Sequence, residues 1–347
     1  MEVSVINSAL ADAHQVCQET TRDLLRVQDL TVRFPEKGGF LTAVDRVSFR
    51  IATGETVGLL GESGCGKTTL GLSLLRLLPD AANVICGSIL FRGREISLLD
   101  EFKLGEVRGA EIAIIYQDSS VLNPVMRVGS QVSEVLRAHR KCTARQAREE
   151  AETVFTAIGL REFDRIYNAY PHQLSGGQRQ RIAIAQALIC KPRLVIADEP
   201  TAAVDRNTAR EILECMKELR NSSDTSFLFI SHDPATLAAI ADRVMVMYAG
   251  QIVEDGRLSD VYSRPLHPYT DALLQCAPQR NALKDCDLRK FRLPYIPGKS
   301  PEPFEVLSGC SFSSRCRDRM EVCDERRPEQ IEISTSRFVR CFKHEVE

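Results

Sequence analysis

A glycine-rich segment between residues 61 and 68 combines residue types that can hold phosphate. It reads Gly61-Glu-Ser-Gly-Cys-Gly-Lys-Thr68 and fits the P-loop pattern G-x-x-x-x-G-K-[ST]. Its glycines allow backbone amides to turn toward phosphate oxygens, and a helix that follows would add to the anion site. Lys67 is expected to reach the β- and γ-phosphates, and the Thr68 hydroxyl to join a Mg²⁺ shell. A chance Lys-Thr pair after a glycine turn is the weaker interpretation, because an apolar strand pattern precedes the segment and an apolar helix pattern follows it.

A second group of candidate residues follows the apolar run Leu194-Val-Ile-Ala197. Asp198 and Glu199 come directly after this run. Four apolar residues predict a buried strand, which would deliver both carboxylates near the phosphates at its carboxyl end. Asp198 would hold Mg²⁺, directly or through water, and Glu199 is the candidate general base for the attacking water. Alone, the run is explained equally well as a strand that enters a polar turn, but downstream of a P-loop it predicts a nucleoside triphosphatase.

These segments need an α/β scaffold to bring them together. Apolar strand-like runs alternate with helical patterns from Leu25 to about Asp260, which is typical of an α/β core. The expected strands cover residues 25–32, 42–51, 56–60, 112–116, 194–197, 226–230 and 244–247. Helices are expected over residues 68–78 and 208–220. Between about residues 128 and 190 the pattern is helical and polar, with residues 144–152 rich in helix formers.

The length of 347 residues predicts one large domain with an extension, or two domains. Residues 1–24 are interpreted as a flexible leader, and residues 25–260 as the nucleotide-binding domain, with a helical subdomain over about 123–190. Prolines cluster after about Val261, so long helices are not expected there. Residues 261–347 are therefore predicted to form a loop-rich extension with its own small core.

Bulk composition excludes several classes of protein. The chain is 44% hydrophobic and 27% charged, which is ordinary for a soluble globular protein. A net charge of −2 gives no reason to expect nucleic acid or an anionic membrane as a partner. No stretch approaches the roughly 18 uninterrupted apolar residues of a membrane helix, and the first residues lack a signal-peptide pattern. The protein is therefore expected in the cytoplasm.

A third segment narrows the class of triphosphatase. Leu174-Ser-Gly-Gly-Gln178 resembles the signature motif of ABC-type ATPases. Ser175 and the amides of Gly176 and Gly177 would form a second anion cradle at the start of a helix. That helix is expected to begin near Gln178. The resemblance implies that this cradle faces the γ-phosphate held by the P-loop of the opposite subunit, so that two cassettes clamp two ATP molecules head to tail.

The same resemblance implies roles for further residues. Gln117 matches the glutamine that touches Mg²⁺ and the attacking water and senses the membrane subunit, and Asp205 matches the aspartate that crosses between subunits. His232 matches the switch histidine that contacts the γ-phosphate. Phe34 matches the aromatic residue that stacks on adenine, with Phe40 as a competing candidate.

The expected site can be stated in full. Glu199 would orient and deprotonate the attacking water, while His232 and Lys67 would stabilise the charge on the γ-phosphate. Catalytic roles are therefore expected for Glu199, His232, Gln117 and Lys67. Mg²⁺ would be held by Thr68, Gln117 and Asp198. The expected nucleotide-binding residues are Phe34, Gly61, Glu62, Ser63, Gly64, Cys65, Gly66, Lys67, Thr68, Thr69, Gln117, Ser175, Gly176, Gly177, Gln178, Asp198 and Asp205.

Four segments, residues 122–124, 170–181, 267–274 and 296–298, are similar to the ATPases of oligopeptide/dipeptide (Opp/Dpp) importers. The resemblance covers roughly residues 25–347. The resemblance implies a P-loop NTPase (RecA-like) core, a helical signature subdomain and a small loop-rich C-terminal cysteine domain. It also implies a peripheral subunit on the cytoplasmic face of the cell membrane. Its partners would be a second ABC ATPase subunit (a paralogue or itself), two integral membrane permease subunits and, indirectly, a solute-binding protein.

The function implied is ATP-driven import of di- or oligopeptides. The same ATPase role for another solute, such as nickel or a glycoside, remains an alternative. An ABC ATPase without membrane partners is a weaker one, because the chain has a single cassette and no sustained heptad pattern. A catalytically silent regulatory subunit is disfavoured, because Lys67, Glu199 and His232 are all present.

Four of the twelve cysteines crowd into the last part of the chain, at Cys310, Cys316, Cys323 and Cys341. Their spacing includes no Cys-x2-Cys pair and matches common zinc-site patterns poorly. Four thiolates in a loop-rich region suit an iron–sulfur cluster, while zinc and free thiols remain alternatives. The Opp/Dpp resemblance implies a [4Fe-4S] cluster at these four residues. Its expected role is to stabilise a weak core, with redox sensing as the alternative.

Overall fold

The computed structural model describes residues 23–36, 39–79, 81–117, 121–202, 204–222, 224–277, 294–301 and 308–345. Within these ranges no helix is long and apolar enough to span a bilayer. The expected leader lies outside the described residues except at its end. Asp23 and Leu24 open the first strand, β1 (Asp23–Glu36), so the leader was predicted two residues too long.

An eight-stranded sheet forms the centre of the molecule, in the order β11-β12-β10-β9-β3-β8-β7-β6. The strands β3, β6, β7, β8 and β9 pair in parallel. Every residue of β3, β7 and β8 is buried, which is typical of parallel strands covered on both faces. The bounds of the central strands are β3 (Thr56–Leu60), β6 (Ile112–Ile115), β7 (Leu194–Asp198), β8 (Ser226–Ser231) and β9 (Arg243–Tyr248). All five were predicted, and the bounds of β3 were predicted without error.

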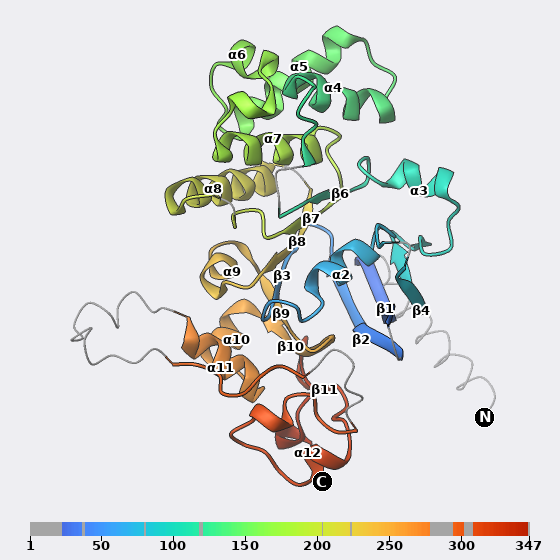
Figure 1. Ribbon diagram of the computed structural model, residues 1–347, viewed down its shortest axis with the longest axis vertical. Helices are drawn as coiled ribbons and strands as arrows, with labels where there is room; N and C mark the ends of the chain where they lie inside the picture. Colours follow the sequence, from blue (N-terminus) through green and yellow to red (C-terminus); the bar gives the residue numbers. More distant parts are fainter. Residues whose placement is uncertain are drawn as a thin grey trace, which may run out of the picture.

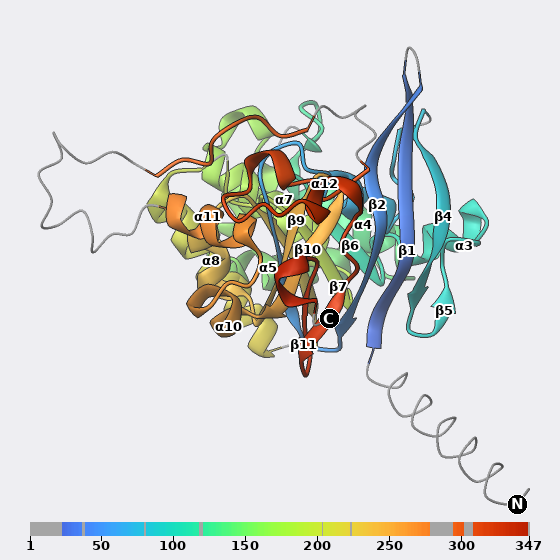
Figure 2. The ribbon, with the colours of Figure 1, turned by 90° about the horizontal axis from the view of Figure 1, so that it is seen from below.

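A smaller antiparallel sheet stands beside the central sheet, in the order β2-β1-β4-β5 (Figure 2). Its strands besides β1 are β2 (Gly39–Ala52), β4 (Asn83–Phe91) and β5 (Arg94–Glu95). Apolar residues of β1 and β2 share one hydrophobic cluster with residues of β3 and of α2 (Lys67–Ser73). The antiparallel sheet therefore packs on the side of the central sheet that carries α2. The sequence predicted β1 and β2 and missed β4 and β5.

The predicted helical region is confirmed as a group of helices at one end of the molecule (Figure 1). Its members are α4 (Val128–His139), α5 (Ala144–Ala157), α6 (Phe163–Asn168) and α7 (Gly176–Leu188). A capping box at Thr143 and Gln146 fixes the start of α5. The helix α8 (Arg206–Ser222) was also predicted, two residues shorter at each end. The helices α3 (Glu101–Val107), α9 (Pro234–Ile240) and α10 (Leu258–Ser263) were not predicted.

The helix after the P-loop is shorter than predicted. We expected it to continue to residue 78, but α2 ends at Ser73. The Ser73 hydroxyl donates to the Leu70 carbonyl at 2.7 Å, and Arg76 adopts a positive φ of 50°. A left-handed residue cannot continue an α-helix, so the chain turns away before residue 78.

The described part of the C-terminal extension packs onto the core of the nucleotide-binding domain. The described part contains α11 (Pro268–Cys276), α12 (Val322–Glu325), β11 (Ile331–Ser334) and β12 (Arg337–Val339). Strand β12 pairs with β10 (Gln251–Arg257), which extends the central sheet. The Phe312 ring lies 5.2 Å from Tyr248 and 5.4 Å from Tyr269, inside the larger hydrophobic cluster. The expectation of a separate small core was wrong, because these aromatic residues pack onto the central sheet.

Candidate active site

The P-loop connects β3 to α2, as predicted. Gly66 adopts a φ of 107°, and a Cβ atom there would lie 2.1 Å from the Ala43 carbonyl oxygen, so only glycine fits. Lys67 is buried, and its amine donates to the carbonyl oxygens of Gly61 and Glu62, both at 2.8 Å. The amine is therefore held inside the loop, where a phosphate oxygen would replace a backbone carbonyl as its partner.

A cavity of about 970 Å³ opens above the P-loop. It is lined by the predicted residues Phe34, Ser63, Gly64, Cys65, Gly66, Lys67, Thr68, Thr69, Gln117, Glu199 and His232. Phe40 also lines it, and its side chain is 56% exposed. Both phenylalanines therefore remain candidates for the residue that would stack on adenine. These predicted residues come from five separate regions of the sequence and meet in one cavity large enough for a nucleotide.

Glu199, His232 and Gln117 converge at one side of this cavity. The Glu199 Oε1 and His232 Nδ1 atoms lie 2.7 Å apart, and Gln117 Nε2 donates to Glu199 Oε2 at 3.5 Å. Glu199 has a φ of 46°, which a non-glycine residue adopts only under constraint. Its N–H donates to the Ile230 carbonyl at 3.0 Å, which ties the residue after β7 to the end of β8. The sheet thus holds the backbone of Glu199, and its carboxylate contacts His232 and Gln117.

Asp198 lies beneath the P-loop at the end of β7. Burial raises the pKa of its carboxyl group, while a hydrogen bond from Thr68 and the charge of Lys67 act in the opposite direction. Its Oδ1 atom is buried and has no hydrogen-bond partner among the described residues. A buried carboxylate oxygen without a partner, beside a hydroxyl, is the oxygen-rich environment that Mg²⁺ requires. The residues present therefore fit a Mg²⁺ ion.

The signature segment forms a helix N-terminus. The N–H of Gln178 donates to the Ser175 hydroxyl at 3.2 Å, and the N–H of Ser175 donates to Gln178 Oε1 at 3.0 Å. This capping box starts α7 at Gly176, two residues before the predicted start near Gln178. A Cβ at Gly177 would lie 2.7 Å from Thr208, so this glycine lets α7 approach α8 closely. The amides of Gly176 and Gly177, the first two residues of α7, have no carbonyl partner within the helix.

Asp205 caps the neighbouring helix α8. Its carboxylate accepts hydrogen bonds from the N–H of Asn207 at 3.0 Å and the hydroxyl of Thr208 at 2.6 Å. The Thr208 hydroxyl bond lowers the pKa of Asp205. Among the described residues, neither Asp205 nor any residue of the signature segment lines the cavity above the P-loop. These two predicted elements therefore lie outside the P-loop cavity of their own chain.

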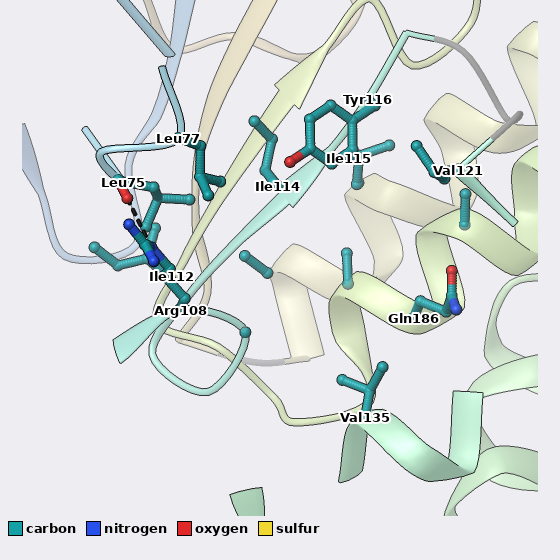
Figure 3. Close-up of a pocket in the computed structure, with 14 residues that line it drawn as sticks. Leu75, Leu77, Arg108, Ile112, Ile114, Ile115, Tyr116, Val121, Val135 and Gln186 are labelled. Atoms are coloured by element: carbon teal, nitrogen blue, oxygen red, sulfur yellow. Dashed lines mark hydrogen bonds between the residues drawn. The ribbon is translucent and has the colours of Figure 1, made fainter. Parts of the chain in front are cut away.

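A second, smaller cavity of about 240 Å³ lies against β6 (Figure 3). Its wall is mostly apolar and includes Leu75, Ile115, Tyr116 and Val121. At one end, Arg108 Nε donates to the Leu75 carbonyl at 2.8 Å. Tyr116, which lines this cavity, immediately precedes Gln117, which lines the cavity above the P-loop.

The four C-terminal cysteines are free thiols in one neighbourhood. Burial raises the pKa of Cys310 to about 11, and the charges of Cys323, Cys341 and Cys316 act in the same direction. The Cys310 N–H donates to the Cys323 carbonyl at 2.7 Å. No group of three or more His, Cys, Asp or Glu side chains in the described ranges is placed to hold a metal ion. The thiols influence one another but do not form a single-ion site.

The sequence analysis missed several residues that line the P-loop cavity. Four of them belong to the C-terminal extension, namely Ser300, Pro301, Ser311 and Arg327. Arg327 Nη1 donates to Asp45 Oδ2 at 2.7 Å, so it is anchored to β2 across the cavity rim. No motif marks these residues, because they reach the site only when the extension folds back onto the central sheet.

Comparison with known proteins identifies two matching families. Residues 44–202 match the ABC transporter family, and residues 253–323 match the family described as oligopeptide/dipeptide transporter, C-terminal region. The dipeptide transport ATP-binding protein DppD of Bacillus subtilis is 42% identical over 321 residues, 92% of this chain and 94% of DppD. The oligopeptide transport ATP-binding protein OppD of Escherichia coli is 40% identical over 342 residues, 98% of each chain.

A solved structure shares the fold of the nucleotide-binding part. The ATP-binding cassette MJ0796, in a dimeric post-hydrolysis state bound to ADP and Pi, superposes with a TM-score of 0.62 and 26% identity. The match covers 67% of this chain and 98% of MJ0796. The remaining third of this chain therefore has no counterpart in that cassette.

Proposed function

Because this chain belongs to the family of ABC transporter ATP-binding subunits that serve oligopeptide and dipeptide transport, we propose that it couples ATP hydrolysis to the import of di- or oligopeptides. One observation carries the proposal. Glu199, His232 and Gln117 come from different strand ends and meet in the cavity that contains the buried lysine of the P-loop. This arrangement suits hydrolysis of a bound triphosphate, in which positioning and electrostatics provide most of the catalysis.

In the proposed mechanism Glu199 orients the attacking water and accepts its proton. His232 holds the Glu199 carboxylate in place and, with Lys67, stabilises charge on the γ-phosphate. Thr68, Gln117 and Asp198 would hold Mg²⁺, which when bound neutralises charge on the β- and γ-phosphate oxygens. The unpaired Oδ1 of Asp198 supports this assignment.

We further propose that a second cassette completes each site. The cradle formed by Ser175, Gly176 and Gly177 would contact the γ-phosphate bound to the P-loop of the partner, and Asp205 would lie at the same contact. The position of both elements outside their own P-loop cavity supports this arrangement. The similar cassette MJ0796 is dimeric with ADP and Pi bound. The partner is either a second copy of this chain or a paralogue.

The remaining partners would be two integral membrane permeases and, through them, a solute-binding protein. The cassette would then act on the cytoplasmic face of the membrane as a peripheral subunit. We assign the permease contact to the region of Gln117, because Tyr116, the residue before it in the chain, lines a mostly apolar cavity (Figure 3). A permease segment bound there would influence Glu199 through Gln117.

The proposed cargo is tested by reconstitution. The chain would be assembled in liposomes with candidate permease subunits, and ATP hydrolysis would be measured with a candidate solute-binding protein loaded with dipeptide, oligopeptide, nickel or a glycoside. Stimulation by peptide-loaded protein, with uptake of labelled peptide, is the expected result. Stimulation by nickel or a glycoside alone would favour the same ATPase with a different cargo. Hydrolysis that no permease alters would contradict the transport role.

We also propose that Cys310, Cys316, Cys323 and Cys341 hold a [4Fe-4S] cluster within the C-terminal extension. Four free thiols that share one neighbourhood, and their location in a loop-rich segment, support this ligand set. When bound, the cluster would cross-link loops that share little apolar core of their own. The first three of these residues fall within the segment that matches the C-terminal transporter family.

Protein purified without oxygen is expected to be brown and to contain about four iron and four sulfide ions per chain. Replacing Cys316 with serine should remove most of the iron, while Cys142→Ser, which alters a thiol outside the set, should leave the iron content unchanged. The measurements are iron and sulfide analysis with visible absorption. Colourless protein that holds zinc or no metal would exclude the cluster.

A further inference from the structure

A paired arginine and glutamate join the C-terminal extension to the P-loop. Arg315 Nη1 donates to Glu62 Oε2 at 2.8 Å, and Nη2 donates to Glu62 Oε1 at 3.0 Å. The Arg315 side chain is only 5% exposed, and Glu62 is 26% exposed. Glu62 is the second residue of the P-loop. A bidentate, largely buried pair is the strong form of this interaction, unlike a surface ion pair.

The other polar groups of Glu62 are also occupied. Its N–H donates to the Tyr269 hydroxyl at 2.9 Å, and its carbonyl accepts a hydrogen bond from Lys67 Nζ at 2.8 Å. The Ser300 hydroxyl donates to Oε2 at 2.8 Å. Three of the residues that bind Glu62, namely Arg315, Tyr269 and Ser300, belong to the C-terminal part of the chain. The extension therefore fixes both the backbone and the side chain of this P-loop residue.

Arg315 is held in place by contacts that do not depend on Glu62. Its Nε donates to the Pro297 carbonyl at 3.0 Å, and Nη1 contacts the Tyr248 hydroxyl at 3.3 Å. The guanidinium also lies over the rings of Tyr248 and Phe312, at 5.8 and 5.9 Å from their centroids. These contacts direct the guanidinium toward the P-loop independently of its hydrogen bonds to Glu62.

The pairing has an electrostatic consequence for phosphate binding. Glu62 brings a negative charge into a loop that must bind a polyanion, and it lies within electrostatic reach of Lys67. Burial opposes ionisation of Glu62, yet hydrogen bonds from Arg315 and Ser300 hold its pKa below its ordinary value. The carboxylate is therefore ionised, and Arg315 offsets its charge. Without Arg315, Glu62 would repel the phosphates and compete with them for Lys67.

We infer that Arg315 is a positioning residue for ATP binding, which holds the P-loop and neutralises Glu62 from the C-terminal extension. This inference rests on the proposed ATPase function. It gives the extension a role at the nucleotide site itself. Cassettes that lack such an extension would need another means of fixing the loop.

The test is steady-state hydrolysis and equilibrium binding of a fluorescent ATP analogue by the full chain. Arg315→Ala should raise KM for ATP about tenfold and change kcat less than threefold, because the loop binds phosphate less well while Glu199 is untouched. The KM of Arg315→Lys should lie between those of the unaltered protein and of Arg315→Ala, because lysine keeps the charge but loses the bidentate geometry. Combining Arg315→Ala with Glu62→Gln should recover most of the affinity, because the unpaired charge is removed. A residue that merely supported folding would show no such rescue.

Arg317→Ala is the matched control. Arg317 pairs with Asp271 of α11, so this variant also breaks an arginine–carboxylate pair of the extension, but an exposed one that lies within the extension and does not involve the P-loop. Its KM should match that of the unaltered protein. An Arg315→Ala variant that is folded and keeps its KM within twofold would overturn the inference, as would a double variant no better than Arg315→Ala. If the unaltered chain binds no ATP, the proposed function itself fails.

Discussion

Replacing Glu199 with glutamine is expected to lower kcat for ATP hydrolysis by about 10²- to 10³-fold, with ATP affinity close to that of the unaltered protein. Glutamine keeps the size of the side chain and a hydrogen bond to His232, but it cannot accept the proton of the attacking water. The Glu199 carboxylate is held by His232 at 2.7 Å and lies outside the P-loop, so its loss should spare nucleotide binding. The measurements are phosphate release and equilibrium ATP binding.

Glu149→Gln is the matched control for this prediction. Glu149 lies on the exposed surface of α5, where it pairs with Arg145, and its loss should alter neither measurement. Near-normal hydrolysis by Glu199→Gln would remove Glu199 from the role of general base. An equal loss of affinity and kcat would show that the side chain mainly supports the shape of the cavity.

Replacing Lys67 with alanine should weaken ATP binding itself, by about 10- to 100-fold, and reduce hydrolysis further. The variant loses the charge at the centre of the P-loop. It also leaves the carbonyl oxygens of Gly61 and Glu62, which now accept bonds from the amine, without that partner. Equilibrium titration with ATP, together with thermal unfolding, separates lost binding from lost folding.

Lys103→Ala provides the comparison, because Lys103 is an exposed lysine that pairs with Asp100 and does not line the cavity above the P-loop. Its affinity for ATP should equal that of the unaltered protein. Unchanged affinity in a folded Lys67→Ala variant would contradict the assignment of residues 61–68 as the phosphate site. Lys67→Ala should lower the affinity for ATP, whereas Glu199→Gln should lower kcat alone. The comparison therefore distinguishes the residue that binds the nucleotide from the residue that acts on it once bound.

The catalytic strands were predictable because their signals are local. Fully buried parallel strands such as β3, β7 and β8 appear as short apolar runs, and the chemistry lies at their carboxyl ends. Glu199 and His232 therefore follow recognisable runs in the sequence. Their meeting at 2.7 Å confirms that the two strand ends come together.

The end of helix α2 and the identity of the aromatic residue expected to stack on adenine were less predictable. Apolar residues continue past Ser73, so periodicity alone did not reveal that α2 stops there. Phe34 and Phe40 both line the cavity, and neither spacing nor position distinguishes the residue that would stack on adenine. These details depend on backbone turns and on packing, which short sequence patterns do not encode.

The role of the C-terminal extension could not be predicted from the sequence. Arg315 and Glu62 are 253 residues apart, and neither spacing nor periodicity links them. The proline-rich composition correctly indicated loops, but it gave no sign that those loops would fold against the P-loop. Contacts of this kind arise from tertiary packing, which residue patterns along the chain do not report.

The pairing of β12 with β10 bears on what happens if the chain is shortened by a protease. The N–H of Arg340 donates to the Val253 carbonyl at 2.9 Å, and Val339 lies opposite Glu254. A cut before β11 would strip this cover and leave a row of unsatisfied backbone groups on the outer side of β10. An edge strand of this kind can pair with strands of other molecules, so we expect the shortened chain to aggregate more readily than the full chain.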